Sequence, residues 1–338
     1  MKEFSVAIAG ITGAVGEVML EILESRNFPV RELFLLASKR SVGKRYQYKS
    51  KMHVVSDLAD FDFSRADIAL FSAGGDISRD FAPKAAKAGC VVIDNTSFFR
   101  QHENIPLIVP EVNPHKVIDY KNENIIANPN CSTIGLMVAL QPIRSAVGIR
   151  RVNVATYQAV SGAGKKAVEE LAGQTARLLN AQPVEPSVFA QQISFNAIPL
   201  CGELQENGYT TEEMKMVWET QKIFEDPDIL VNPTCVRVPV FYGHGEAIHL
   251  ETKKPIDVED ALELLKNAEG VSVIDEKDPA DFPTAVRDAA GQDPVYVGRL
   301  RKDISSDNGL SMWIVSDNVR KGAALNSVQI AELLKEHL

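Results

Sequence analysis

Residues 9–19 read AGITGAVGEVM and decide the fold of the first half of the chain. Three glycines in this stretch are spaced G-x-x-G-x-x-G. They follow a short apolar run, residues 4–10, of the kind that forms a buried parallel strand. They precede residues 14–25, where apolar side chains recur on one helical face. The stretch therefore predicts a strand, a tight turn and a helix in direct succession.

This succession of strand, turn and helix is what a dinucleotide cofactor requires. The turn lets the backbone approach a pyrophosphate closely, and the helix N-terminus presents free N–H groups to it. The spacing departs from plain G-x-G-x-x-G, and an ordinary glycine turn is the alternative. The expected cofactor-binding residues are Gly10, Thr12, Gly13, Ala14, Val15 and Gly16.

The end of the second predicted strand indicates which dinucleotide would bind. NAD sites usually carry an acidic residue there, which holds the ribose hydroxyls. The sequence LFLLASKRSVGKR (33–45) has no acidic residue and places Ser38, Arg40 and Ser41 in this region. An Arg fork and hydroxyl groups suit a 2′-phosphate, which a carboxylate would repel. NADP is therefore the expected cofactor, with a solvated basic turn as the alternative.

Strand and helix patterns alternate through the first third of the chain. This alternation predicts an α/β fold that begins with a Rossmann-like doubly wound parallel sheet. After about residue 150 several strands show period-2 alternation, which predicts an α+β domain with a mostly antiparallel sheet. Residues 181–210 are expected to form a long irregular connection. The expected domains are residues 1–130 plus 319–338, where the final amphipathic helix returns to the first domain, and residues 131–318.

Composition excludes several classes of protein. The length of 338 residues suggests two domains at about 150 residues each. The net charge of −9 argues against non-specific nucleic-acid or membrane binding, and no apolar run approaches the ~18 residues of a membrane span. The four cysteines lack C-x-x-C spacing, which disfavours zinc and a disulfide scaffold. We expect no metal and a cytoplasmic location, where thiols stay reduced.

Cys131 is the cysteine whose position suggests chemistry. It follows a predicted strand, residues 124–128, and so lies at the carboxyl edge of the sheet, where open α/β folds bind ligands. It also begins the helical run STIGLMVALQPI, and a helix N-terminus favours a thiolate. A thiolate beside a nicotinamide can form a thioester with an aldehyde or acyl substrate. A buried structural cysteine is the alternative.

His244 is the preferred acid/base candidate among six histidines. It lies between two glycines in FYGHGEA, after a strand that carries Arg237. Flanking glycines leave the imidazole uncrowded, and histidine suits proton transfer near neutral pH. Arg237 in an apolar alternating strand needs a partner for its charge.

Taken together, these motifs resemble those of the aspartate-β-semialdehyde dehydrogenase family. The resemblance rests on NPNCST, QAVSGAG, NGYTTEEMKMVWET, RVPVFYGHGEA and VSDNVRKGAA, and it spans essentially the whole chain. It implies that Cys131 is the nucleophile that forms an acyl thioester and that His244 supplies the acid/base step. It also implies that the second domain mediates homodimer formation.

The resemblance further implies a set of binding residues. Gln158 would orient the substrate, Arg237 would bind its α-carboxylate, and Arg100 and Lys215 would bind phosphate. The substrate amine would meet Glu212 or Glu213, and Glu212 is preferred because its i, i+3 spacing places it on the helical face of Lys215. Three further residues would contact the cofactor, namely Ser161, Gly162 and Asn318.

The implied reaction is the NADPH-dependent reduction of aspartyl 4-phosphate to aspartate 4-semialdehyde, which feeds lysine, methionine and threonine synthesis. A related reductase of N-acetyl-γ-glutamyl phosphate is an alternative, but it would not need an acidic residue for a free amine. A glyceraldehyde-phosphate type dehydrogenase would carry a different cysteine motif. A non-catalytic dinucleotide sensor would have no reason to keep Cys131, Gln158, Arg237 and His244 together.

Overall fold

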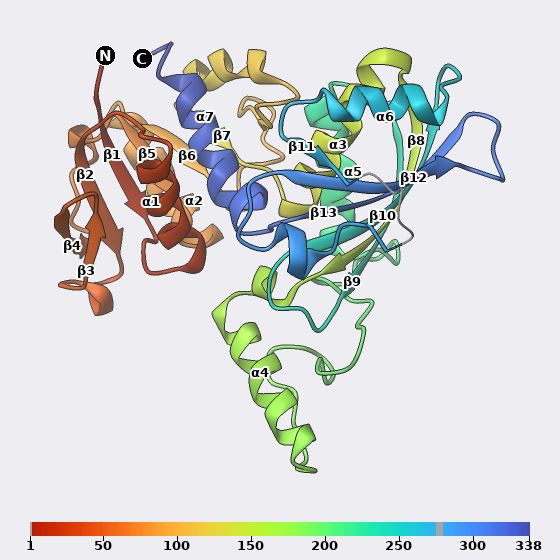
Figure 1. The fold of residues 1–338 in the computed structure, drawn as a ribbon. Coiled ribbons are helices and arrows are strands. Elements are labelled where there is room, and N and C mark those ends of the chain that lie inside the picture. The colour runs from red at the N-terminus through yellow and green to blue at the C-terminus, as the bar shows by residue number, and fades with distance from the viewer. Residues whose placement is uncertain (1, 275–279) are drawn as a thin grey trace. The chain divides into compact units, whose positions relative to one another are not determined.

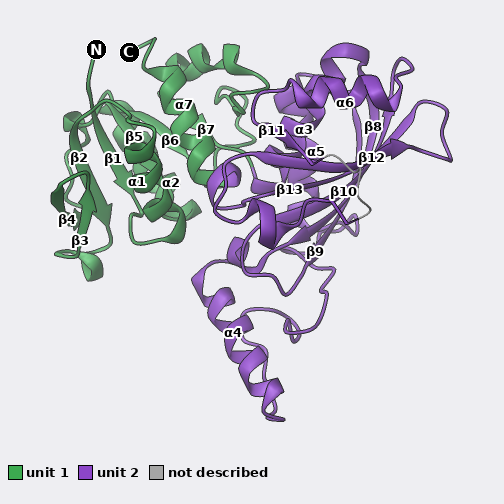
Figure 2. Ribbon diagram, in the orientation of Figure 1, with its two compact units in different colours: residues 1–129, 323–338 green, residues 130–322 purple. Residues whose placement is uncertain are grey.

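The computed structural model describes residues 2–274 and 280–338, and the chain forms two compact units (Figure 2). Unit 1 comprises Met1–Pro129 and Ala323–Leu338. Unit 2 comprises Asn130–Gly322. The C-terminal segment therefore belongs to the same unit as the N-terminal strand.

Unit 1 is built on a seven-stranded sheet of order β3-β4-β2-β1-β5-β6-β7 (Figure 1). From β4 to β7 every neighbouring pair is parallel, and the order matches that of a dinucleotide-binding sheet. β3 is antiparallel to β4. The strands are β1 (Phe4–Ala9), β2 (Val30–Ala37), β3 (Arg45–Tyr48), β4 (Lys51–Asp57), β5 (Ile68–Phe71), β6 (Val91–Asp94) and β7 (Ile125–Ala127).

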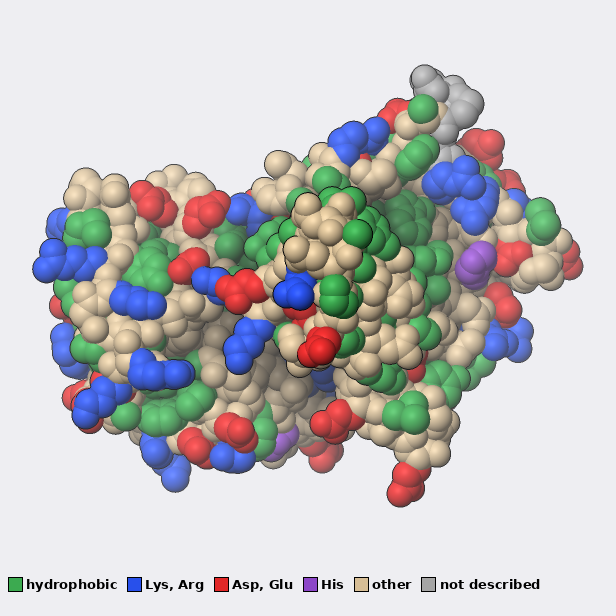
Figure 3. Space-filling view, turned by 90° about the horizontal axis from the view of Figure 1, so that it is seen from below, with side chains coloured by type: hydrophobic (Ala, Val, Ile, Leu, Met, Phe, Trp, Pro, Cys, Tyr) green, Lys and Arg blue, Asp and Glu red, His purple; other side chains and the backbone are tan. Residues whose placement is uncertain are grey.

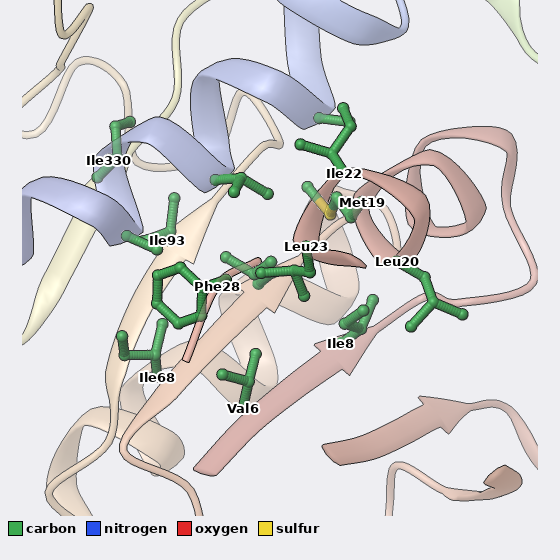
Figure 4. Close-up of a cluster of buried hydrophobic side chains, with 14 of the residues drawn as sticks. Val6, Ile8, Met19, Leu20, Ile22, Leu23, Phe28, Ile68, Ile93 and Ile330 are labelled. Carbon is green, nitrogen blue, oxygen red and sulfur yellow. The ribbon is translucent and has the colours of Figure 1, made fainter. Parts of the chain in front are cut away.

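The helices of unit 1 form because their apolar residues recur at helical spacing and need a sheet face to cover. They are α1 (Ala14–Ser25), α2 (Gly75–Lys87) and α7 (Asn326–Leu334), with short 3₁₀ turns at η1 (Lys39–Ser41), η2 (Phe63–Arg65) and η3 (Pro114–Asn122). Met19 and Leu23 of α1 pack with Ile330 of α7 over Ile8 and Ile68 of the sheet (Figure 4). This cluster fixes α1, and with it the glycine turn, against the strands.

Unit 2 contains a six-stranded sheet of order β11-β12-β13-β10-β8-β9. Three of its five pairings are antiparallel, and the two outermost, β11 with β12 and β8 with β9, are parallel. The strands are β8 (Ile149–Gln158), β9 (Leu230–Arg237), β10 (His244–Thr252), β11 (Val271–Val273), β12 (Val295–Lys302) and β13 (Gly309–Ser316). The mostly antiparallel sheet predicted from period-2 alternation is confirmed.

Helices cover one face of this second sheet, and the alternate burial along its strands reflects that arrangement. They are α3 (Cys131–Val147), α5 (Thr211–Phe224) and α6 (Val258–Lys266). α4 (Lys165–Leu179) extends away from the sheet (Figure 1) and shares a small apolar cluster with the following connection, residues 181–210. Shorter turns are η4 (Val160–Ala163), η5 (Ala285–Ala289) and η6 (Arg320–Leu325).

Two local features differ from the sequence predictions. The β3–β4 hairpin was not expected, because its turn uses Lys49 at φ 53° rather than the Asn-Gly pair that marks such turns. The final segment is not one continuous helix, because the wide turn η6 precedes α7.

Within the described residues, no helix has the length and apolar character needed to cross a membrane. The same residues contain no cluster of His, Cys, Asp and Glu suited to a metal ion. On the face drawn in Figure 3, Lys and Arg side chains are interspersed with Asp and Glu.

Candidate active site

The glycine turn of unit 1 has the packing that a phosphate-binding turn needs. Gly10 has φ +97°, and a Cβ there would lie 2.4 Å from the Ser72 carbonyl oxygen. A Cβ on Gly16 would lie 2.3 Å from the Gly10 carbonyl oxygen, so only glycine lets α1 start this close to β1. A Cβ on Gly13 would meet only one atom, at 3.4 Å. Gly13 and its neighbours Thr12 and Ala14 are at least partly open to solvent, which leaves backbone there for a ligand to approach.

The residues expected to select the cofactor follow β2 directly. Ser38 and Arg40 are exposed and Ser41 is half-buried, in and before the short turn η1. No carboxylate interrupts this turn, which reads SKRS. The side chains are therefore available to an anionic group at this edge of the sheet.

Cys131 is the first residue of α3, as the sequence predicted. Asn130 ends the preceding turn and its side-chain oxygen accepts the Ser132 N–H at 3.0 Å, a standard N-cap. The thiol therefore lies at the positive end of a 17-residue helix. Gly322 packs directly against it, since a Cβ at Gly322 would lie 2.7 Å from the Cys131 Cβ.

His244 is brought to the thiol across unit 2. Its Nε2 lies 3.3 Å from the Cys131 Sγ, although the two residues are 113 positions apart in the chain. Its Nδ1 accepts the backbone N–H of Ala159 at 3.0 Å. The imidazole is buried, and burial, followed by the nearby positive charge of Arg237, lowers the pKa of His244 to about 3.

The other three cysteines are buried and unsuited to nucleophilic chemistry. Burial raises the pKa of Cys90 to about 12 and that of Cys201 to about 11, and it raises the pKa of Cys235 further. Cys131 alone among the four is partly exposed. The structure thus singles out the cysteine that the sequence selected.

Gln158, Glu212 and Lys215 lie in one hydrogen-bonded group beside the start of α3. Gln158 is buried and its Nε2 donates to the Ser132 hydroxyl at 2.8 Å. The Glu212 carboxylate accepts from the Asn130 side chain at 2.8 Å and from Lys215 Nζ at 3.0 Å. The i, i+3 pair predicted on one helical face is therefore present.

Glu213 has a different role in the structure. It completes the capping box of α5 with Thr210, and its other oxygen accepts the Cys235 N–H at 2.9 Å. Its carboxylate is thus committed to backbone groups. Glu212 is the one that shares the hydrogen-bonded group beside Cys131.

Arg237 and the segment 159–163 also lie close to His244. Arg237 is 8% exposed and its Nη1 donates to the Ala159 carbonyl at 2.8 Å. A Cβ at Gly162 would lie 3.0 Å from that Nη1 and 3.4 Å from His244 Nε2, so Gly162 lets the chain pass close to both. Ser161 and Asn318 hydrogen-bond to each other, with Asn318 Nδ2 donating to the Ser161 hydroxyl at 2.9 Å.

Arg100 belongs to unit 1, in the loop after β6. It is 8% exposed, and its Nη2 donates to the Asn95 carbonyl at 3.0 Å. It is therefore not the ordinary surface charge that its residue type suggests. Unit 2 brings together Cys131, Gln158, Glu212, Lys215, Arg237 and His244, whereas unit 1 carries Arg100 and the glycine turn.

Several residues of the site were not predicted. Glu219 accepts the Asn130 N–H at 2.6 Å and so helps to hold the turn before Cys131. Ser132 links that turn to Gln158, and the backbone of Ala159 contacts both His244 and Arg237. An Asn before a helical run predicts an N-cap. A hydrogen bond from a backbone N–H to a distant side chain cannot be predicted from the sequence, because nearly every residue has such an N–H.

Comparison with known proteins agrees with this geometry. The family model described as semialdehyde dehydrogenase, NAD binding domain, matches residues 5–120, and the one described as semialdehyde dehydrogenase, dimerisation domain, matches residues 140–321. Aspartate-semialdehyde dehydrogenase 2 of Vibrio cholerae is 62% identical over 333 residues, which cover 98% of each chain. The chain belongs to the aspartate-semialdehyde dehydrogenase family. It is an oxidoreductase that acts on an aldehyde group together with phosphate.

Two solved structures extend the comparison. The Vibrio cholerae aspartate semialdehyde dehydrogenase II complexed with ASA matches with a TM-score of 0.98 and 61% identity, and the match covers 99% of each chain. The Candida albicans aspartate semialdehyde dehydrogenase with NADP has a TM-score of 0.75 and 26% identity, and the match covers 99% of each chain. A nicotinamide dinucleotide is thus the cofactor of an aspartate-semialdehyde dehydrogenase such as this one. Membership of this family decides against the related reductase and the non-catalytic sensor.

Proposed function

We propose that this chain reduces aspartyl 4-phosphate to aspartate 4-semialdehyde with NADPH, through an acyl thioester on Cys131. The observation that carries the proposal is the 3.3 Å contact between Cys131 Sγ and His244 Nε2 at the start of α3. A thiol at a helix N-terminus, beside an imidazole and partly open to solvent, is equipped for nucleophilic attack on an acyl group.

The surrounding charges fit the substrate. Arg237 would bind the α-carboxylate in two parallel hydrogen bonds, which its planar guanidinium allows. Glu212 would bind the ammonium group, since Glu213 is committed to the cap of α5. Gln158 would orient the acyl group beside the thiol, and Lys215 and Arg100 would bind the phosphate that leaves.

The chain's own residues perform the steps around the thiol. Cys131 attacks the acyl carbon, the bond to phosphate breaks, and the phosphate carries away the electron pair. The bound nicotinamide supplies the hydride. The carbon–sulfur bond then breaks, which releases the semialdehyde and returns the Cys131 sulfur. His244 holds or exchanges a proton at Nε2 during these steps.

NADP is the preferred dinucleotide. Ser38, Arg40 and Ser41 follow β2 where an NAD site would have a carboxylate, and Arg40 is exposed for a 2′-phosphate. The NADP held by the Candida albicans relative supports the choice. Ser161, Gly162 and Asn318 are proposed to contact the nicotinamide half of the cofactor.

The active form is proposed to be a homodimer in the cytoplasm, formed through the face of the second sheet that α3, α5 and α6 leave uncovered. Tyr157 and Trp313 lie side by side on that face, with ring centroids 5.4 Å apart; Tyr157 is 41% exposed and Trp313 is half-buried. The dimerisation-domain match over residues 140–321 supports this arrangement. Sedimentation of the purified chain tests it.

One assay tests the proposed reaction. The chain is mixed with aspartate semialdehyde, phosphate and NADP, and NADPH is followed by absorbance, with NAD in a parallel sample. Cys131→Ala should abolish turnover and still bind NADP, and the matched control Cys90→Ala should keep turnover. Turnover that survives in Cys131→Ala would contradict covalent catalysis by this thiol.

A further inference from the structure

The side-chain amides of Asn95, Asn128 and Asn326 form a hydrogen-bonded series within unit 1, here called the amide network. Asn326, the first residue of α7, donates from Nδ2 to Oδ1 of Asn128 at 2.7 Å. Asn128 follows β7 and donates from its own Nδ2 to Oδ1 of Asn95 at 2.7 Å. Asn128 and Asn326 are fully buried, whereas Asn95 is half-buried and directly follows β6. The amide network therefore leads from the interior of unit 1 to the carboxyl edge of its sheet.

A backbone carbonyl fixes the direction of the amide network. The Ile108 carbonyl can only accept, and it lies 2.9 Å from the Asn326 amide, so the atom of Asn326 at this contact is Nδ2. The same nitrogen donates to Asn128, so Asn128 presents its oxygen there and its nitrogen to Asn95. The Ala323 carbonyl, 3.5 Å from Asn128 Nδ2, agrees with this orientation. The assignment of oxygen and nitrogen in all three amides follows from these contacts.

The other polar groups of Asn95 already have partners. Its N–H donates to the Phe71 carbonyl at 2.9 Å, and its carbonyl accepts from Arg100 Nη2 at 3.0 Å. Its Oδ1 accepts from Asn128. The remaining group, Nδ2, has no hydrogen-bond partner within residues 2–274 and 280–338 and is not fully buried. Asn95 thus offers one donor of fixed direction to a ligand.

Asn95 lies on the edge of the sheet that carries the expected cofactor-binding residues. The turn η1, expected to bind the adenosine end, follows β2, and the glycine turn, expected to bind the pyrophosphate, follows β1. β5 and β6 lie on the opposite side of β1 from β2. Because a dinucleotide crosses the carboxyl ends of the strands, the nicotinamide half is left for the ends of β5 and β6. Asn95 is the residue that follows β6.

We propose that Asn95 is a further cofactor-binding residue, whose Nδ2 donates a hydrogen bond to an acceptor oxygen of the nicotinamide riboside of NADP. Asn128 and Asn326 are positioning residues, because they determine which end of the Asn95 amide faces the cofactor. The inference rests on the proposed function, since it takes NADP as the cofactor. It adds a contact on the nicotinamide half that NADP and NAD share.

Replacement of Asn95 by Asp separates ligand binding from folding. Asp keeps an oxygen that accepts from Asn128, but it places a second, negatively charged oxygen where Nδ2 was. We expect Asn95→Asp to raise the Kd for NADP by about tenfold to a hundredfold, because a donor is lost and a negative charge faces an anionic cofactor. The Kd for NAD should rise by a similar factor. Calorimetric titration measures both constants, and the Tm of the variant should stay close to that of the wild type.

A fragment of the cofactor shows which half is affected. Adenosine 2′,5′-bisphosphate lacks the nicotinamide riboside, so Asn95→Asp should bind it with the wild-type Kd. Asn104→Asp is the matched control, since it adds the same charge at an exposed asparagine of unit 1, and it should bind NADP normally. An equal loss of affinity for the fragment would overturn the proposal. A raised KM for phosphate with an unchanged Kd for NADP would also overturn it, and would assign Asn95 to the substrate phosphate.

Hydrogen exchange of side-chain amide protons tests the direction of the amide network in the wild-type chain. The chain is labelled with ¹⁵N-asparagine, and the Asn95 signals are assigned by their loss in Asn95→Asp. The Asn95 NH₂ protons should exchange rapidly in the free chain and slowly once NADP is bound. Slow exchange in the free chain, or exchange that NADP leaves unchanged, would overturn the proposal.

The binding results also separate the inference from the proposed function. If the wild-type chain binds neither NADP nor NAD, the proposed function and the inference both fail. If the wild-type chain binds NADP and Asn95→Asp binds it equally well, the inference alone fails.

Discussion

Glu246 is a buried carboxyl group close to His244, and its protonation state in the folded chain can be tested. It lies on β10, 1% exposed, two residues after His244 and on the same face of the strand. Neither carboxyl oxygen has a hydrogen-bond partner among the described residues. Burial raises its pKa well above the usual value, so the folded chain keeps this acid protonated.

Gln has the same shape as Glu and does not titrate. Replacement of Glu246 by Gln therefore makes the effect of the buried acid measurable, as a difference in how the free energy of unfolding changes with pH. In the unfolded chain Glu246 releases its proton above pH ~4.3, whereas the folded chain retains it. Because the folded pKa is raised, the wild type loses stability as pH rises above the unfolded pKa, by up to about 1.4 kcal/mol per pH unit, until the folded pKa is reached. Between pH 5 and 7 the stability of Glu246→Gln relative to the wild type should therefore increase by up to about 3 kcal/mol.

Urea unfolding followed by tryptophan fluorescence measures this difference. Both tryptophans, Trp218 and Trp313, lie in unit 2, so the signal reports the unit that contains Glu246. Glu251→Gln is the matched control on the same strand, where the side chain is 32% exposed, and it should show little change with pH. A Glu246→Gln difference that stays constant from pH 5 to 7 would refute the buried neutral acid.

Three further predictions concern the cofactor and the substrate. Gly16→Ala should weaken NADP binding and lower Tm, because its Cβ would lie 2.3 Å from a carbonyl oxygen, while Gly13→Ala should fold normally; equal Tm values would contradict this. Arg40→Ala should raise the Kd for NADP by roughly tenfold to a hundredfold and leave that for NAD nearly unchanged, by calorimetry. A parallel loss for both cofactors would exclude a 2′-phosphate contact. Glu212→Ala should raise KM for the semialdehyde, whereas Glu213→Ala should cost about 1 kcal/mol of stability through the lost cap of α5 and spare KM. The reverse pattern would assign the amine contact to Glu213.

The fold was largely predictable because its elements carry strong periodic patterns. The strand from residue 4 and the helix over 14–25 end within a residue of their predicted bounds, since Gly10 and Gly13 mark the turn between them. The hairpin of β3 and β4 was not predictable in the same way. Its strands are half-exposed, and Lys49 occupies a left-handed turn position that normally selects Gly or Asn.

The reactive side chains of the site could be predicted from the sequence, but the hydrogen bonds that orient them could not. Cys131 and His244 stand in distinctive local sequences, so both could be named before their 3.3 Å contact was known. The Ala159 N–H that orients the imidazole could not be named, because every residue except proline has such a group. Glu246 shares a strand face with Ile248 and Leu250, and that spacing is the signal that would have indicated a buried acid.

The central claim is that the Cys131 sulfur carries the acyl group. With semialdehyde and NADP but without phosphate, the thioester should accumulate as NADPH forms in a single turnover. Acid quench and peptide mass spectrometry should then find one aspartyl group on the peptide that contains Cys131. A burst of NADPH with that peptide unmodified, or with the group on another cysteine, would contradict the account.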